Sequence, residues 1–145
     1  MLTNLIAVAF QKVPPAKETA KKLMSYFLNI NPRTKRQNVI EDIVVVMDGS
    51  GSIGSCEFTK GKKALQIMIG VAYGAKVAAV TFASSATVNF KFMPYNLAAN
   101  KMIDISYPRG STNTQAGLTE AKKLFDDSSS GINVILYSIT PLNLF

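Results

Sequence analysis

Long apolar runs alternate with amphipathic segments over the last two thirds of the chain. An unbroken run of four β-branched residues and a methionine, at residues 43–47, ends at Asp48. Such a run is typical of a central parallel strand that is buried on both faces. Residues 76–82 and 132–139 are also apolar and predict two more buried strands. Residues 87–92 alternate strictly between apolar and polar, which predicts an antiparallel edge strand with one solvent-facing side.

Helical periodicity separates these strands. Ser55 is predicted to cap a helix that runs to about Tyr73 and is ended by Gly74. Residues 94–105 are expected to form a short helix or an irregular segment, and a second long helix is predicted from Thr112 to Phe125. The order strand, helix, strand, hairpin predicts a Rossmann-like, doubly wound α/β sheet that is mostly parallel with one antiparallel edge strand.

The first 40 residues have a different character. Apolar residues recur at helical spacing from Ala20 to Leu28 opposite several lysines, which predicts a basic amphipathic helix. Residues 29–38 are polar, contain a proline and are typical of a linker. We therefore expect a basic N-terminal segment at residues 1–40 and one α/β domain at residues 41–145.

The net charge of +7 follows this division. Residues 1–41 hold seven Lys or Arg against two Glu, a balance of +5, and the remaining residues hold nine against seven, a balance of +2. A solvated helix face explains this asymmetry better than a polyanion site. Nucleic-acid binding is not expected, because no basic run is interleaved with aromatic residues.

Composition restricts several classes of function. No apolar run approaches the roughly 20 residues that cross a bilayer, so no transmembrane segment is expected. The chain has no histidine, which excludes a histidine base and histidine zinc ligands. Cys56 is the single cysteine, so an internal disulfide is excluded. The apolar run at residues 5–10 is a poor secretory signal, since no charged residue precedes it.

The loop after the first strand carries the candidate chemistry. Open α/β sheets bind their ligands at the carboxyl ends of the strands. Asp48, Ser50 and Ser52 offer only oxygen atoms, and the intervening glycines allow the backbone to curl so that the three side chains converge. Magnesium prefers oxygen ligands and commonly holds only one or two protein carboxylates. The loop therefore predicts a divalent-cation site.

This DGSGS sequence after an apolar strand resembles the metal-ion-dependent adhesion site of von Willebrand factor type A domains. The segment RGSTNTQAGL, Arg109 to Leu118, is similar to the family segment that supplies a threonine, with Thr112 at the matching position. The resemblance covers roughly residues 40 to 140 and is strongest to matrilin-like matrix and adhesion members. It implies that Mg²⁺, or Mn²⁺ or Ca²⁺, is held by Asp48, Ser50, Ser52 and Thr112.

The resemblance also implies a role and a location. It suggests a non-enzymatic adhesion module, secreted or at the cell surface and part of a longer chain, whose bound ion takes an Asp or Glu of a matrix or other extracellular partner. The family places an aspartate after the strand at 132–139, where this sequence has Pro141, so weaker ion binding is expected. The family's later strands have no counterpart. We therefore expect a domain truncated at its C-terminus and less stable than a complete one, with residues 132–139 as an exposed apolar edge.

Two other interpretations remain open. Residues 49–54, GSGSIG, match the dinucleotide-binding pattern, although Asp48 would then lie against the pyrophosphate and no acidic residue ends the second strand. Alternatively, the domain is a metal-independent interaction or scaffold module that uses the basic helix or an exposed sheet edge. The loop is then a tight turn in which Asp48 interacts with the following helix dipole, and binding survives a chelator. Serine nucleophile chemistry is excluded because no histidine can activate Ser50 or Ser52.

Overall fold

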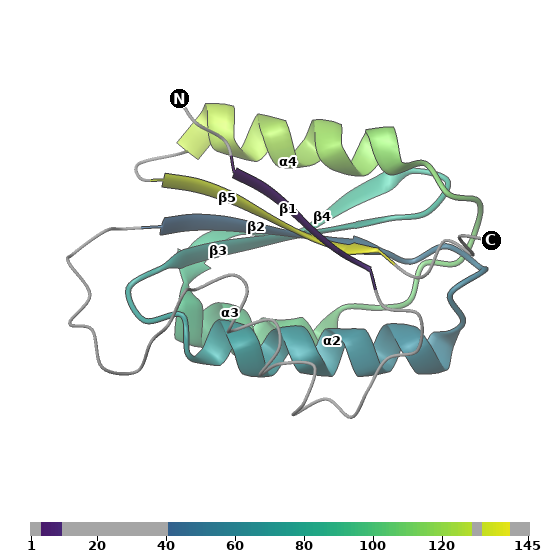
Figure 1. The fold of residues 1–145 in the computed structure, drawn as a ribbon, viewed down its shortest axis with the longest axis horizontal. Helices are drawn as coiled ribbons and strands as arrows, with labels where there is room; N and C mark the ends of the chain where they lie inside the picture. Colours follow the sequence, from purple (N-terminus) through teal and green to yellow (C-terminus); the bar gives the residue numbers. More distant parts are fainter. Residues whose placement is uncertain (1–3, 10–40, 129–131, 140–145) are drawn as a thin grey trace.

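A computed structural model describes residues 4–9, 41–128 and 132–139. Its strands are β1 (Asn4–Ala9), β2 (Glu41–Asp48), β3 (Lys76–Phe82), β4 (Ala86–Pro94) and β5 (Ile132–Ile139). They form one sheet in the order β1-β5-β2-β3-β4 (Figure 1). β4 is antiparallel to β3, and every other neighbouring pair is parallel. The predicted fold class, with its antiparallel edge strand, is confirmed.

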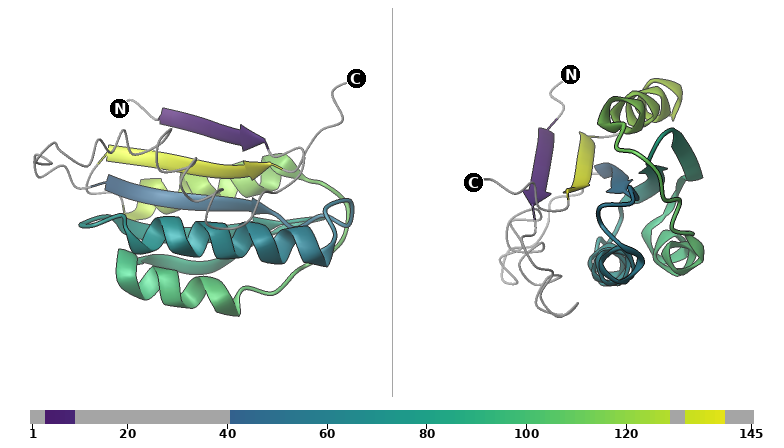
Figure 2. Two further views of the ribbon diagram at one scale, coloured as in Figure 1. Left: turned by 60° about the horizontal axis from the view of Figure 1, so that its bottom comes forward. Right: turned by 90° about the vertical axis from the view of Figure 1, so that its right-hand side faces the viewer.

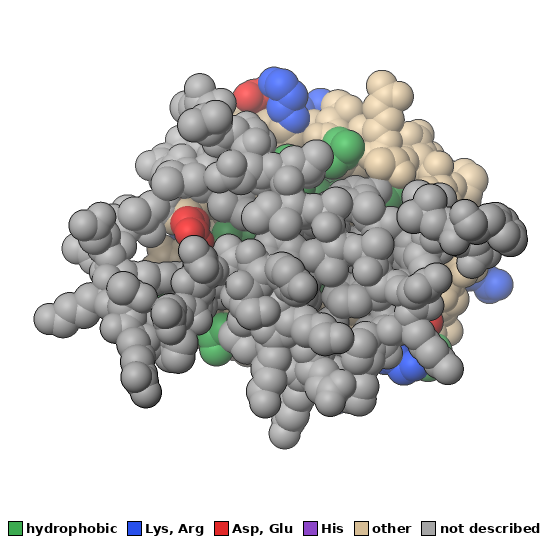
Figure 3. Space-filling view, viewed as in Figure 1, with side chains coloured by type: hydrophobic (Ala, Val, Ile, Leu, Met, Phe, Trp, Pro, Cys, Tyr) green, Lys and Arg blue, Asp and Glu red, His purple; other side chains and the backbone are tan. Residues whose placement is uncertain are grey.

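Helices lie on both faces of this sheet. They are α2 (Ser55–Gly70), α3 (Tyr95–Lys101), the 3₁₀ helix η1 (Met102–Asp104) and α4 (Thr114–Ser128). Figure 2 shows α2 and α3 side by side on one face and α4 on the other. Exposed ion pairs follow the outer surface of α4, where Lys122 pairs with Asp126 and Lys123 pairs with Glu120. Figure 3 shows acidic and basic side chains next to each other where α4 lies at the top of the view.

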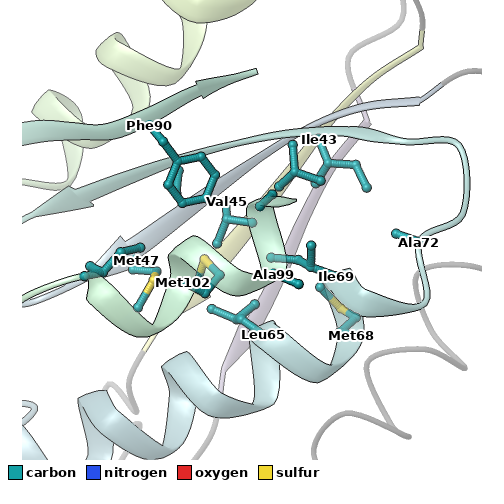
Figure 4. Close-up of a cluster of buried hydrophobic side chains, with 14 of the residues drawn as sticks. Ile43, Val45, Met47, Leu65, Met68, Ile69, Ala72, Phe90, Ala99 and Met102 are labelled. Carbon is teal, nitrogen blue, oxygen red and sulfur yellow. The ribbon is translucent and has the colours of Figure 1, made fainter. Parts of the chain in front are cut away.

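The unbroken apolar run of β2 is explained by these two helical layers. Ile43, Val45 and Met47 belong to the core beneath α2 and α3, which Figure 4 shows around Leu65, Met68, Ile69 and Met102. Val44 and Val46 belong to the second core, beneath α4. Because both faces of β2 are covered, every position in its centre is apolar.

The ends of the helices differ from the prediction. Ser55 is the first residue of α2 and does not cap it; Gly54, with φ +79°, precedes the helix. The helix ends at Gly70, short of Tyr73, and Gly74, with φ +83°, lies in the turn before β3. The last long helix begins at Thr114, beyond the predicted start at Thr112. Its start is fixed by Asn113, whose Oδ1 accepts the Ala116 N–H at 3.1 Å.

The prediction that β5 is an exposed edge is wrong. β1 pairs with β5 in parallel, from Asn4 opposite Val134 to Ala9 opposite Ile139, so β1 is the edge strand of the described sheet. Residues 5–9 of the apolar run, which the sequence presents as a poor secretory signal, thus lie in a strand. The predicted helix at 20–28, the linker at 29–38 and Pro141 lie outside the described residues. The domain boundary at residues 40 and 41 stays a prediction, although β1, which precedes this boundary in the sequence, belongs to the same sheet as the other strands.

No helix in the described ranges is long and apolar enough to cross a membrane.

Candidate metal centre

Asp48 is the last residue of β2 and lies at the carboxyl edge of the sheet. Its side chain is only 8 % exposed, and its Oδ1 accepts a 2.8 Å hydrogen bond from the Ser50 N–H. The next residue, Gly49, donates its N–H to the Phe82 carbonyl at the end of β3, at 2.7 Å. The loop is therefore tied both to its own carboxylate and to the neighbouring strand, which holds Asp48 at the edge where α/β sheets bind ligands.

Ser50 and Ser52 bring two hydroxyl oxygens together just beyond Asp48. Ser50 is buried and Ser52 is exposed, and their Oγ atoms are 3.0 Å apart, with either able to donate. Octahedral Mg²⁺ with bonds of 2.0–2.1 Å holds adjacent ligands about 2.9 Å apart. The separation of the two hydroxyls therefore fits two adjacent ligand positions. It also fits a simple hydroxyl–hydroxyl hydrogen bond.

Three backbone carbonyls fasten residues 107–113 to this loop and its neighbour. The Gly51 N–H donates to the Gly110 carbonyl at 2.8 Å, and the Tyr107 hydroxyl donates to the Ser50 carbonyl at 2.8 Å. The Asn113 N–H donates to the Ala83 carbonyl, also at 2.8 Å. The family resemblance paired the DGSGS loop with this segment, and the structure brings the two together.

Thr112 lies in that fastened segment and is exposed. Asp48, Ser50 and Ser52 are thus grouped on one loop, with Thr112 on the adjacent segment. Within the described residues, no hydrogen bond joins the Thr112 side chain to the other three. Its part in an ion site accordingly stays a prediction.

Sequence reasoning missed Tyr107 and Pro108. The Tyr107 ring packs on Phe58 of α2, with 5.2 Å between ring centroids, while its hydroxyl reaches the Ser50 carbonyl. Pro108 covers Gly49 so closely that a Cβ on that glycine would lie 2.3 Å from Pro108 Cγ. A glycine is therefore needed at position 49 for close approach rather than for a special φ. The Tyr-Pro pair before Arg109 was the available signal.

The surrounding charges are few. Within the described part of the chain, no three His, Cys, Asp or Glu side chains are grouped as they would be around a metal. An ion bound by the predicted residues would therefore have one carboxylate, that of Asp48, and the ligand set stays a prediction. Near the start of α2, a 2.7 Å hydrogen bond to the Glu57 carboxylate raises the pKa of Lys60. Cys56 is free and exposed.

Several solved structures share this fold. The three N-terminal domains of the type V pili tip protein Mfa5 from Porphyromonas gingivalis match with 22 % identity and TM-score 0.58, over 68 % of this chain and 19 % of that one. The vWF domain of Mfa5 alone matches with 22 % identity and TM-score 0.56, over 70 % and 37 %. An uncharacterized membrane spanning protein from Vibrio fischeri matches with 21 % identity and TM-score 0.56, over 63 % and 52 %. The chain thus spans about half or less of these proteins' lengths. No curated protein matches it.

The family comparison covers the sheet and the loop together. The family model of the von Willebrand factor type A domain matches residues 42–140, which is more than half of the 145-residue chain. The match begins in β2, includes the Asp48 loop and the segment of Thr112, and extends just past β5. Domains of this kind are generally non-enzymatic protein–protein interaction modules. The chain belongs to the von Willebrand factor type A domain family.

Proposed function

We propose that this domain is an adhesion module that binds an acidic residue of a partner protein through a divalent cation. The ion, Mg²⁺ or else Mn²⁺ or Ca²⁺, would be held by Asp48, Ser50, Ser52 and Thr112. The observation that carries the proposal is the 3.0 Å separation of the Ser50 and Ser52 hydroxyl oxygens on a loop that begins at a buried carboxylate. This set of oxygens supports the proposal because Mg²⁺ takes oxygen ligands and usually binds through only one or two protein carboxylates.

Each residue would have a distinct task. Asp48 supplies the negative charge, and the Ser50 and Ser52 hydroxyls occupy adjacent positions around the ion. Thr112 coordinates directly or through a water molecule. One carboxylate neutralises only half of a divalent charge, so the ion would attract the carboxylate of an incoming Asp or Glu. Pro141 stands where the family has an aspartate, and we therefore expect weak intrinsic affinity for the ion.

An extracellular or cell-surface location agrees with the similar structures. Mfa5 is described as a pilus tip protein, and the similar Vibrio fischeri protein as membrane spanning. Both solved chains are longer than this one, which supports the proposal that the domain works within a longer protein. We propose in addition, from the family resemblance alone, that this protein is matrilin-like and binds matrix or other extracellular proteins. Secretion remains part of this proposal.

A second candidate is a metal-independent interaction module. Asp48 already accepts the Ser50 N–H, and the Ser50 and Ser52 hydroxyls satisfy each other. The loop is therefore closed by its own hydrogen bonds, as a stable turn would be. Partner binding by such a module would continue after all divalent cations are removed.

Calorimetric titration of Mg²⁺ and Mn²⁺ into the purified chain tests the first candidate. Saturable binding is expected, with loss in Asp48→Ala and weakening in Ser52→Ala. Ser55→Ala is the matched control, because Ser55 is also an exposed serine but lies in α2 outside the loop. Because the Asp48 side chain accepts a hydrogen bond within the loop, circular dichroism must also be used to check that Asp48→Ala is folded. If neither ion binds the unaltered chain, the metal-dependent function is refuted and the chelator-resistant candidate stands.

A further inference from the structure

Three loops meet at the carboxyl edge of the sheet, residues 48–54, 83–85 and 107–113, and together we call them the site loops. They contain two charged side chains, Asp48 and Arg109. Asp48 is 8 % exposed, whereas Arg109 is exposed. A partner that approaches the site loops therefore meets a guanidinium before it meets a carboxylate.

The backbone of Arg109 has an unusual conformation. Its φ of +55° lies in the left-handed region, and no other non-glycine residue has a positive φ in the described ranges. This conformation disfavours any residue with a Cβ, and arginine has no short polar side chain to offset it. Strain of this kind persists where the surroundings impose it, and it is concentrated at functional sites.

The surroundings impose it here through both neighbours of Arg109. Pro108 packs against Gly49, where an added Cβ would lie 2.3 Å from Pro108 Cγ. Gly110 accepts the 2.8 Å hydrogen bond from the Gly51 N–H. The two neighbours of Arg109 therefore contact the two glycines that flank Ser50, and the backbone of Arg109 is held between these contacts. The backbone of Arg109 is thus tied to the loop that carries Ser50 and Ser52, and its exposed side chain extends from that anchored point.

We propose that Arg109 binds the partner's carboxylate directly, as a second recognition element beside the hydroxyl pair. The inference rests on the proposed function only for the acidic nature of the partner. A planar guanidinium offers paired N–H donors that match both oxygens of one carboxylate, which a metal ion or an ammonium group does not. Because Arg109 is exposed, its contribution is modest, and its loss should weaken carboxylate binding about 5-fold.

Arg109 also acts on the ion, with the opposite sign. A fixed positive charge near a site with one carboxylate repels a divalent cation. Removal of this charge should therefore tighten Mg²⁺ or Mn²⁺ binding while it weakens binding of a carboxylate in the absence of metal. A residue that only maintained the loop would weaken both, so the pair of measurements separates recognition from a structural role.

The experiment uses ¹⁵N-labelled chain and two peptides, acetyl-Gly-Gly-Glu-Gly-Gly-amide and its glutamine counterpart, titrated in EDTA and followed by amide chemical shifts. The variants are Arg109→Asn, which keeps a residue tolerant of positive φ, and Arg109→Lys, which keeps the charge but loses the planar fork. Lys91→Asn is the control, because Lys91 is exposed on β4 and its replacement removes one positive charge outside the site loops. A dispersed amide spectrum verifies the fold of each variant.

We expect the glutamate peptide alone to shift the amides of residues 109–111, with affinity about 5-fold lower in Arg109→Asn, intermediate in Arg109→Lys and unchanged in Lys91→Asn. Equal binding of the two peptides, no binding in EDTA, or equal losses in Arg109→Asn and Lys91→Asn would each overturn the inference. A metal titration of the same variants, after EDTA has been removed, tests the proposed function separately. Ion binding that requires Asp48, without an Arg109 effect on the peptide, would leave that function standing and remove this inference.

Discussion

Helix α4 lies close to the sheet at Gly117, and one added methyl group tests this close approach. A Cβ on Gly117 would lie 2.7 Å from Cδ1 of the Phe82 ring and 3.2 Å from Cγ1 of Val46. Phe82 and Val46 are fully buried in neighbouring strands, so neither side chain can move into solvent to make room. Gly117→Ala adds this methyl and changes nothing else in the side-chain chemistry.

The magnitude follows from comparison with a second helical glycine. Gly61 lies within α2, and a Cβ there would meet nothing within 4 Å. Alanine is more favourable than glycine in a helix by about 1 kcal/mol, so Gly61→Ala should stabilise the domain by about that amount. Gly117→Ala gains the same propensity term but overpacks the core, which costs about 1–3 kcal/mol. The two variants should therefore differ by about 1–3 kcal/mol, and this difference isolates the packing term.

Urea denaturation followed by circular dichroism measures both variants against the unaltered chain. We expect a higher midpoint for Gly61→Ala and an equal or lower midpoint for Gly117→Ala, with unchanged slopes. If Gly117→Ala raises the midpoint as much as Gly61→Ala, the close contact of α4 with Phe82 does not exist, and the placement of α4 is wrong.

Three further results are expected. Tyr107→Phe should destabilise the domain by about 1 kcal/mol in chemical denaturation, because the Ser50 carbonyl loses its 2.8 Å donor while the ring is kept; an unchanged free energy of unfolding would show that this bond contributes nothing. Amide hydrogens of β1 that bond to β5 should exchange more slowly than amides of unpaired backbone, and uniformly fast exchange would contradict the parallel pairing. Glu57→Gln should lower the pKa of Lys60 in an NMR titration, since the Glu57 bond raises it. A raised pKa stabilises the fold below the ordinary value of 10.5 and this effect is lost as the pH rises through the folded value, so the variant and the unaltered chain should converge in stability at alkaline pH; an unshifted Lys60 pKa would exclude the Glu57 contact.

The sequence predicted those strands whose burial can be inferred from their own pattern of apolar and polar residues. β2 is covered on both faces and is apolar at every central position. β4 is the antiparallel edge strand that was predicted, but the prediction of one solvent-facing side is wrong: Phe90 packs in the core beneath α2 and α3, whereas Val88 and Phe92 pack against the core beneath α4, because the register with β3 shifts between them.

The helix ends were less accurate, because they depend on single contacts. The residue that precedes α2 is Gly54, whereas the prediction assigned the cap to Ser55. The start of α4 is fixed by one hydrogen bond to Asn113.

β1 could not be inferred, because its partner is distant in sequence. Asn4 lies opposite Val134, and a six-residue apolar run carries no sign of which strand it joins. The family resemblance was misleading here as well. It begins after residue 40, so it left β5 as an edge that the chain itself covers with an earlier strand.

In the candidate site, too, local groupings could be predicted from the sequence and contacts between distant segments could not. Asp48, Ser50 and Ser52 are close in sequence, and their grouping follows from one turn. Tyr107 reaches Ser50 across 57 residues, and nothing in the local pattern of either segment indicates that contact. The left-handed backbone of Arg109 is likewise imposed from outside, by the packing of its two neighbours against the Asp48 loop.

The pairing of one buried carboxylate with one exposed guanidinium has a consequence for how the domain would recognise a partner. An ion held by Asp48 and the guanidinium of Arg109 both favour a carboxylate, so they select the same acidic partner but respond differently to the solution. Recognition through the ion is abolished by a chelator, whereas recognition through Arg109 survives a chelator and weakens with salt, because exposed charges are screened at a Debye length of about 8 Å in physiological salt. Partner binding measured with and without EDTA at two salt concentrations would therefore assign the contribution of each. A partner whose binding responds to neither condition would not be held by these two groups, and its contact surface would have to lie away from the site loops.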